Sequence, residues 1–335
     1  MKAIIFNKEK KPTYVDIKEP EINKLNMVKI RVDSSGLCGS DIHRIKNDNL
    51  ENRILGHEFS GTVEEIGSSV STINIGDRIV AIPFIPCYEC KPCVDEEYAL
   101  CYNLEAAGKT VQGAFAEKII MPGKNLIRIK ETMSSDIAAL TDVVAVALHV
   151  YNLANKPNNK EILIIGDGTI GISNLQLFKY HNNNITVIGK NNGVHVTSNG
   201  GKYVPSNSIN DLPNNYFDVI VECVGGKQES TLNESIRLIK PKGKIIIDGV
   251  FKKGYTPGIN ARELFYKEAI LQGSNSYSIS INNNEFLDAL NLIEKGVIDV
   301  NKLISYRLHL SKFQEGLNMF QDKERYNTLK IIFNP

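Results

Sequence analysis

A glycine-rich turn between an apolar run and a helical pattern limits the folds open to this chain more than any other feature. Residues 161–171 read EILIIGDGTIG, and the segment that follows, SNLQLFKYH, has helical spacing. Glycines in this context give a tight turn, let the backbone approach a pyrophosphate and allow close helix packing, while helix N-terminal amides face the anion. The segment therefore predicts a dinucleotide site, whose predicted contact residues are Gly166, Gly168, Thr169, Ile170 and Gly171.

Further apolar runs follow the glycine turn at regular intervals. They lie at 185–188 (ITVI), 217–224 (FDVIVECV) and 244–248 (KIIID), with helix-like or turn segments between them. Alternation of this kind predicts an α/β fold with a parallel, doubly wound sheet. Val224, at the end of the second of these runs, is a further predicted cofactor contact.

The end of the second predicted strand bears on which dinucleotide binds. An acidic residue there would accept hydrogen bonds from the adenosine ribose and reject a 2′-phosphate. The chain instead reads ITVIGKNNG, which places Gly189 and Lys190 at this point. An uncharged strand end beside a cation favours NADP over NAD, although Lys190 is equally compatible with a solvated surface lysine.

Four of the six cysteines fall within fifteen positions, at Cys87, Cys90, Cys93 and Cys101. Disulfides between cysteines this close are strained, and disulfide-dense folds belong to short secreted chains. Two-residue gaps let neighbouring thiolates turn toward one zinc ion, and four sulfurs fill its tetrahedral shell. We therefore predict a closed structural zinc site; the alternative is a set of four free surface thiols.

The bulk composition narrows the range of partners. The chain has 335 residues and a formal net charge of +1, so it carries no excess basic field for nucleic acid or an anionic membrane. Small molecules are the expected partners. The N-terminus reads as two strands around a polar turn and lacks the apolar core of a signal peptide, so we expect a cytoplasmic protein.

A second group of metal-binding residue types lies in the first half of the chain. Residues 36–43 read GLCGSDIH and residues 56–58 read GHE, so Cys38 and His57 are candidate zinc ligands. A catalytic zinc uses three protein ligands and keeps one position open. Asp142 is the candidate third ligand, with Glu58 as a possible exchangeable carboxylate. A structural cysteine, a core histidine and a helix-capping aspartate are the alternative interpretations of Cys38, His57 and Asp142.

Taken together, these motifs resemble the zinc-dependent medium-chain dehydrogenases, also called zinc alcohol dehydrogenases, over essentially the whole chain. The resemblance rests on GLCGSDIH, LGHEFSGTV, GDRI, the four-cysteine segment, the glycine loop and VECVGG. Within the family the chain looks most like the polyol and sugar-alcohol-phosphate branch. The resemblance implies a strand-rich, GroES-like catalytic domain over 1–150, rejoined by 286–335, and a Rossmann domain over 151–285.

The family resemblance also implies roles for individual residues. Cys38 and His57 would hold the catalytic zinc, and Asp41 would orient His57. Ser40 would take the proton of a substrate hydroxyl, and His43 would pass it toward solvent. The chain departs from the polyol branch at Asp142-Val143, where Glu-Pro is usual, and this departure puts the third ligand in doubt.

The function expected from this resemblance is reversible hydride transfer between NAD(P) and a secondary alcohol of a polyol or sugar-alcohol phosphate. A phosphate would need a basic rim, for which Arg44 and Arg53 are candidates. Two alternatives stay open: a simple secondary-alcohol or diol dehydrogenase, and a non-catalytic dinucleotide-binding sensor or scaffold. Family relatives are dimers or tetramers, so a homodimer or homotetramer is expected.

Overall fold

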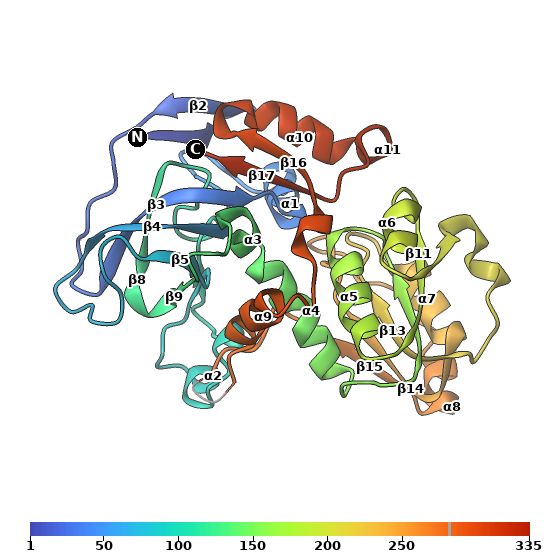
Figure 1. Ribbon diagram of the computed structural model, residues 1–335. Coiled ribbons are helices and arrows are strands. Elements are labelled where there is room, and N and C mark those ends of the chain that lie inside the picture. Colours follow the sequence, from blue (N-terminus) through green and yellow to red (C-terminus); the bar gives the residue numbers. More distant parts are fainter. Residues whose placement is uncertain (281–282) are drawn as a thin grey trace. The chain divides into compact units, whose positions relative to one another are not determined.

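The chain forms two compact units in the computed structural model shown in Figure 1, which describes residues 1–280 and 283–335. One unit comprises Met1–Asp142, Ser278–Glu294 and Ile304–Pro335, and the other comprises Val143–Tyr277 and Lys295–Leu303. The boundaries predicted at 150 and 285 lie slightly later than the limits at 142 and 277, and Lys295–Leu303, predicted as part of the first domain, lies in the second unit. The assignment of separate roles to the two domains stays a prediction.

The second unit contains a six-stranded sheet in the order β12-β11-β10-β13-β14-β15, and all of its pairs are parallel. This confirms the doubly wound sheet expected from the alternating pattern. Parallel strands are covered on both faces and hence read as continuous apolar runs, as in Ile162–Ile165, where every side chain is buried. The strands are β10 (Glu161–Ile165), β11 (Asn184–Gly189), β12 (Lys202–Pro205), β13 (Phe217–Glu222), β14 (Ile239–Ile247) and β15 (Ile270–Gly273).

Two pairs of helices pack against this sheet. The helices α5 (Thr169–Tyr180) and α6 (Gly193–Ser198) contact each other, as do α7 (Glu229–Leu238) and α8 (Ala261–Lys267). The strand order runs outward from β10 in one direction and from β13 in the other, so right-handed crossovers place the two pairs on opposite faces. The order reverses between β10 and β13, which is the point where such sheets bind ligands at their carboxyl edge.

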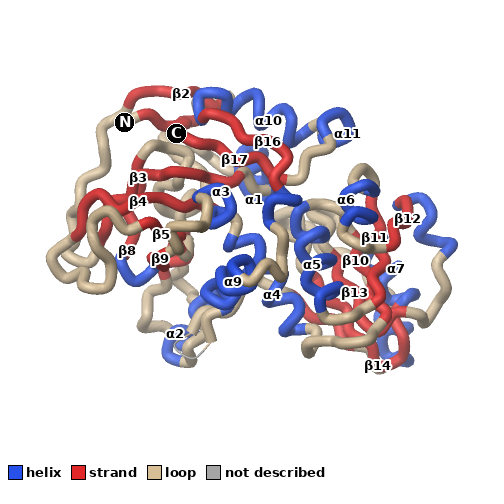
Figure 2. The backbone as a smooth tube through the Cα atoms, viewed as in Figure 1, coloured by secondary structure: helices blue, strands red, loops and turns tan. Residues whose placement is uncertain are grey.

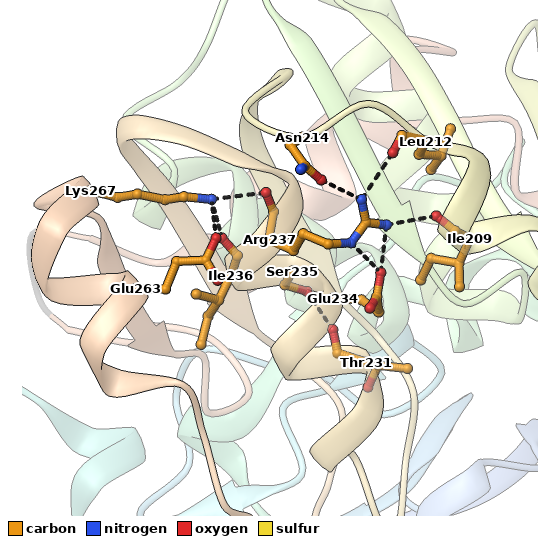
Figure 3. A network of polar contacts seen from close by, with 10 residues as sticks. All are labelled: Ile209, Leu212, Asn214, Thr231, Glu234, Ser235, Ile236, Arg237, Glu263 and Lys267. Carbon is orange, nitrogen blue, oxygen red and sulfur yellow. Dashed lines mark hydrogen bonds and ion pairs between the residues drawn. The ribbon is translucent and has the colours of Figure 1, made fainter.

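A buried lysine and an arginine hold the C-terminal end of α7 (Figure 3). The Nζ of Lys267 donates to the carbonyl oxygens of Ile236 and Arg237 and forms an ion pair with Glu263. The guanidinium of Arg237 donates to the carbonyl oxygens of Ile209 and Leu212. Lys267 thus satisfies carbonyl oxygens at the end of the helix. Arg237 ties the segment before β13 to α7.

We expect Lys267→Met to lower the free energy of unfolding by about 1–3 kcal/mol, because it leaves buried carbonyl oxygens without donors. Lys242→Met is a matched control, since Lys242 and Glu268 form an ion pair whose side chains are 81% and 72% exposed. That control should change stability by less than about 0.5 kcal/mol. Urea unfolding measures both changes, and equal losses in the two variants would contradict the prediction.

The first unit is built on a mostly antiparallel sheet that the end of the chain completes, and its one parallel pair among the described residues is β16 with β17. Its order is β16-β17-β3-β4-β5-β9, and β8 also pairs with β3. The last strand, β17, lies beside β3 with Phe333 opposite Ser35, so the tail rejoins the first unit. The strands are β3 (Met27–Gly36), β4 (Glu58–Ile66), β5 (Arg78–Ala81), β8 (Lys118–Pro122), β9 (Leu126–Arg128), β16 (Ile304–His309) and β17 (Lys330–Asn334).

The predicted N-terminal pair of strands is present as β1 (Lys2–Phe6) and β2 (Pro12–Asp16), paired antiparallel. Behind them, Phe115, Phe313 and Phe333 form a buried aromatic cluster with ring centroids 4.8–5.9 Å apart. Figure 2 shows that loops make up most of the segment around the short helix α2 (Lys91–Val94). This scarcity of regular structure explains why the segment needs another source of rigidity.

The remaining elements are short or connect the two units. They are α1 (Gly39–Asn47), α2 (Lys91–Val94), α3 (Ser135–Ala139), α4 (Thr141–Leu153), α9 (Glu285–Glu294), α10 (Phe313–Gln321), α11 (Lys323–Tyr326), β6 (Phe84–Ile85) and β7 (Glu105–Ala106). Within the described part of the chain, none of the helices has the length and apolar character needed to cross a membrane.

Candidate active site

The fold brings Cys38, His57 and Glu58 together. Cys38 caps the N-terminus of α1, Glu58 is the first residue of β4, and His57 directly precedes it. One ligand atom from each side chain lies within 4.8 Å of the others. A thiolate, an imidazole and a carboxylate are the donors that zinc uses in catalytic sites, so the donor set fits that ion.

Asp41 links the two strongest candidate ligands. Its Oδ2 accepts a hydrogen bond from the backbone N–H of Cys38 at 3.0 Å, and its Oδ1 lies 3.4 Å from Nδ1 of His57. The second contact is short enough for electrostatic attraction but does not meet hydrogen-bond geometry. Burial opposes ionisation of Asp41, but the nearby imidazole and the Cys38 N–H outweigh it and lower the pKa of this carboxyl. These contacts support the predicted role of Asp41 in orienting His57.

Glu58 is held by a lysine from the last strand. Nζ of Lys330 lies 2.8 Å from both carboxylate oxygens, and the two residues are each 2% exposed. Burial disfavours the charged ammonium group, but the Glu58 carboxylate outweighs that effect and raises the pKa of Lys330. An ion pair this well formed competes with metal binding, and this fits the prediction that Glu58 is an exchangeable ligand.

The third predicted ligand, Asp142, is not a member of this group. Among the described residues, the ligand atoms gathered with those of Cys38 and His57 belong to Glu58. Asp142 lies on another element, at the second position of α4, and its side chain is 8% exposed. A role for Asp142 in metal binding stays a prediction.

The two predicted proton-transfer residues lie one helical turn apart on α1. Ser40 and His43 are both half-buried, and their i,i+3 spacing puts them on the same side of the helix. Their side chains form no hydrogen bond with each other among the described residues. The relay from Ser40 to His43 therefore stays a prediction.

The geometry of the four-cysteine segment matches a zinc site. The sulfur–sulfur separations are 3.5 Å (Cys87–Cys101 and Cys90–Cys93), 3.8 Å (Cys90–Cys101) and 4.0 Å (Cys87–Cys93). A tetrahedron with zinc–sulfur bonds of about 2.3 Å has edges of about 3.8 Å. All four thiols are free, so no disulfide competes for them. The closed set of sulfurs fits the predicted structural ion.

The glycine turn after β10 forms the cradle that a dinucleotide pyrophosphate requires. Gly166 has φ +119°, in the region that favours glycine, and a Cβ at Gly171 would lie 1.9 Å from the carbonyl oxygen of Gly166. Gly168 caps α5, whose first residues are Thr169 and Ile170. A Cβ at Gly168 would meet nothing within 4 Å, so the turn is open there. The backbone therefore fits the ligand class predicted from the sequence.

Two residues that sequence reasoning missed are important at these sites. Lys330 is the only charged residue within the apolar run TLKIIF, and that isolated charge is the signal that could have identified it. Asp167 lies inside the glycine turn, and its carboxylate reaches the end of β11. The predicted strand end at Gly189 and Lys190 is therefore not free of acidic groups.

Val224, another predicted cofactor contact, lies just beyond β13 beside a buried acid. Oε1 of Glu222 accepts hydrogen bonds from the N–H of Val224 at 3.2 Å and from the hydroxyl of Thr231 at 2.8 Å. Oε2 of Glu222 is buried without a hydrogen-bond partner among the described residues. Burial raises the pKa of Glu222 to about 7, and burial also raises the pKa of Asp248 to about 7.

We expect Glu222→Gln to flatten the dependence of stability on pH. Because the folded-state pKa exceeds the unfolded value, the folded protein binds more protons between the two values, and stability falls as pH rises from about 4.5 to about 7. The substitution should recover up to about 3 kcal/mol above that range. Urea unfolding across it tests this, with Glu229→Gln as control, because the pKa of Glu229 is lowered. Unchanged pH dependence in Glu222→Gln would contradict the prediction.

Two family models match the chain, one in each half. The model described as "Alcohol dehydrogenase GroES-like domain" matches residues 24–131, and the model described as "Zinc-binding dehydrogenase" matches residues 175–295. Galactitol 1-phosphate 5-dehydrogenase of Escherichia coli K12 is 38% identical over 159 residues, which are 47% of this chain and 46% of that enzyme. This match thus spans about half the length of the curated relative.

Solved structures match over the full length. The crystal structure of galactitol-1-phosphate dehydrogenase from Escherichia coli has a TM-score of 0.89 and 25% identity, with 100% of each chain covered. A zinc-binding dehydrogenase from Sinorhizobium meliloti 1021 with bound NADP has a TM-score of 0.89 and 25% identity, with 100% of this chain and 99% of that chain covered. Fold, site and relatives agree: the chain belongs to the zinc-dependent medium-chain dehydrogenase family. The predicted combination of a GroES-like and a Rossmann domain is confirmed.

Proposed function

We propose that the protein is an oxidoreductase that transfers hydride between NAD(P) and a secondary alcohol of a polyol or sugar-alcohol phosphate. One observation carries the proposal: the same chain holds a zinc-type donor group at Cys38, His57 and Glu58 and an open glycine cradle after β10. The similarity to galactitol-1-phosphate dehydrogenase supports the substrate class. Arg44, whose Nη1 lies 3.9 Å from Oδ1 of Asp41, is a candidate contact for a substrate phosphate.

Different residues of the chain have separate roles in the proposed reaction. Cys38 and His57, with Asp142 or Glu58, would hold a zinc ion, which when bound lowers the pKa of an alcohol hydroxyl. Ser40 takes the hydroxyl proton and His43 passes it toward solvent. A bound NAD(P)⁺ would accept the hydride of the substrate carbon, so the alcohol would become a ketone and the cofactor NAD(P)H. A positioned general base typically contributes 10²–10⁴-fold, or about 3–5 kcal/mol.

For the cofactor, we propose more specifically that the protein binds NADP in preference to NAD. Lys190 is exposed and forms no hydrogen bond or ion pair with any residue that the structure describes, so its ammonium group is available to a 2′-phosphate. Gly189 leaves no side chain of its own at the strand end. The NADP bound to the Sinorhizobium relative is compatible with this preference.

We also propose a cytoplasmic homodimer or homotetramer. In the second unit, β15 is an edge strand of the sheet, and Phe265, Tyr266 and Ile270 nearby are 75%, 68% and 49% exposed. Apolar side chains beside an open strand edge favour association with another chain. Analytical ultracentrifugation of the wild-type protein and of a Phe265→Glu variant tests this proposal.

Two measurements test the activity. Metal analysis should find two zinc ions per chain, whereas a scaffold without a catalytic site should retain one. Polyols, their phosphates and simple secondary alcohols are then assayed with NAD and NADP, near neutral pH and at mildly alkaline pH, through the absorbance of the reduced nicotinamide. Turnover of simple alcohols alone would favour a simple secondary-alcohol dehydrogenase. Absence of turnover with every substrate in protein that holds two zinc ions would refute the polyol assignment.

A further inference from the structure

The side chain of Asp167 bridges the glycine turn and the turn that follows β11. Its Oδ2 accepts hydrogen bonds from the backbone N–H groups of Asn191 at 2.8 Å and Asn192 at 2.7 Å. In return, Nδ2 of Asn192 donates to the carbonyl oxygen of Asp167 at 2.8 Å. Three hydrogen bonds, two of them to a charged acceptor, thus join two loops that lie more than twenty residues apart in sequence.

The position of this carboxylate explains why residue 189 is glycine. A Cβ at Gly189 would lie 2.1 Å from Cγ of Asp167 and 2.2 Å from its Oδ2. Any larger residue at this strand end would displace Asp167 from the N–H groups of the next turn. The glycine at 189 and the aspartate at 167 therefore form one arrangement, in which the acidic group comes from the glycine turn instead of from the strand.

Asn192 adds a second, independent observation. Its side chain is 1% exposed, and its Oδ1 is buried with no hydrogen-bond partner among the described residues. Burying an amide oxygen without a donor is costly, so it is expected where a ligand or an ordered water supplies the donor. The turn that Asp167 fixes therefore begins with the exposed Lys190. It also contains a buried acceptor, Oδ1 of Asn192, to which no described residue donates a hydrogen bond.

We propose that Asp167 is a positioning residue for cofactor discrimination: it fixes the Lys190–Asn192 turn so that Lys190 meets the 2′-phosphate of NADP. This inference rests on the proposed function. The two backbone hydrogen bonds to the carboxylate both go to Oδ2, and the donors belong to the two residues directly after Lys190. A lysine on an anchored turn loses less conformational freedom on binding a phosphate than one on a free turn.

Equilibrium titration of the intrinsic fluorescence of NADPH and NADH tests the inference without turnover. Asp167→Ala removes the anchor and should weaken NADPH binding about tenfold while changing NADH binding by less than about threefold. Asp167→Asn keeps an acceptor at the same place and should retain most of the NADPH affinity. Lys190→Ala should lower the ratio of NADPH to NADH affinity in the same direction as Asp167→Ala.

Asp218→Asn provides the matched control in the same unit. The Asp218 carboxylate also accepts a backbone N–H, that of Glu161 at 3.0 Å, but it lies at the amino end of β13. This variant should leave the affinity ratio unchanged, and thermal unfolding identifies any general loss of structure in either variant.

Three results would overturn the inference, and they differ in whether they also refute the proposed function. Tighter NADPH binding in Asp167→Ala would show that the carboxylate repels the phosphate, as expected of an NAD-selecting acid. An unchanged ratio in Asp167→Ala, with dinucleotide bound by the wild-type protein, would refute the positioning role and leave the proposed function intact. Failure of the wild-type protein to bind either dinucleotide would refute both.

Discussion

Replacing Lys330 by methionine is expected to lower the free energy of unfolding by about 3–5 kcal/mol. The substitution leaves the Glu58 carboxylate, which is 2% exposed, without the ammonium group that lies 2.8 Å from both of its oxygens. Methionine has nearly the same length as the lysine stem, so lost packing contributes little and the effect reports mainly the uncompensated buried charge. Chemical denaturation of the purified protein in the presence of a chelator measures the change without a contribution from metal binding.

Two further variants separate the buried charge from other causes. The double variant Lys330→Met with Glu58→Gln should recover most of the loss, because a neutral amide costs less to bury than an unpaired carboxylate. Lys18→Met removes the lysine of an exposed ion pair with Glu21, whose side chains are 83% and 73% exposed, and should change stability by less than about 1 kcal/mol. A loss in the double variant as large as that in the single variant would contradict the explanation.

The Lys330–Glu58 pair also shows which features of the site can be predicted from the sequence. Cys38 and His57 were predictable because each residue lies in a short motif whose chemistry is local. The isolated charge of Lys330 in TLKIIF marks that residue as unusual but does not reveal its partner, because Lys330 contacts Glu58 only after the tail pairs with β3, and no spacing in the sequence encodes that return. Contacts between residues this far apart depend on strand order, which patterning determines only in outline.

The nucleotide unit shows the same division between local and long-range information. The parallel sheet follows from runs of apolar residues separated by helical segments, and the glycine turn marks the start of α5. The approach of Asp167 to Gly189 was missed, because the acidic group expected at the end of the second strand is supplied by another loop. A rule that looks for an acidic residue at the end of the second strand does not detect a carboxylate that reaches this strand end from another loop.

Replacing Cys93 by serine is expected to remove one of the two zinc ions proposed for each chain and to unfold the segment around α2. The thiol of Cys93 lies 3.5 Å from that of Cys90 and 4.0 Å from that of Cys87, so its loss opens a shell that three sulfurs fill poorly. The segment is mostly loop, and zinc binding contributes roughly 10–16 kcal/mol in isolated zinc-finger peptides, so the ion is expected to supply most of its order. Metal analysis and limited proteolysis measure the two effects.

Cys223→Ser is the control, because Cys223 belongs to neither ligand group and should leave both ions bound. Retention of two ions by Cys93→Ser, with the segment still resistant to protease, would mean that the chain orders these four thiols without metal, and the short sulfur–sulfur separations would then need another cause.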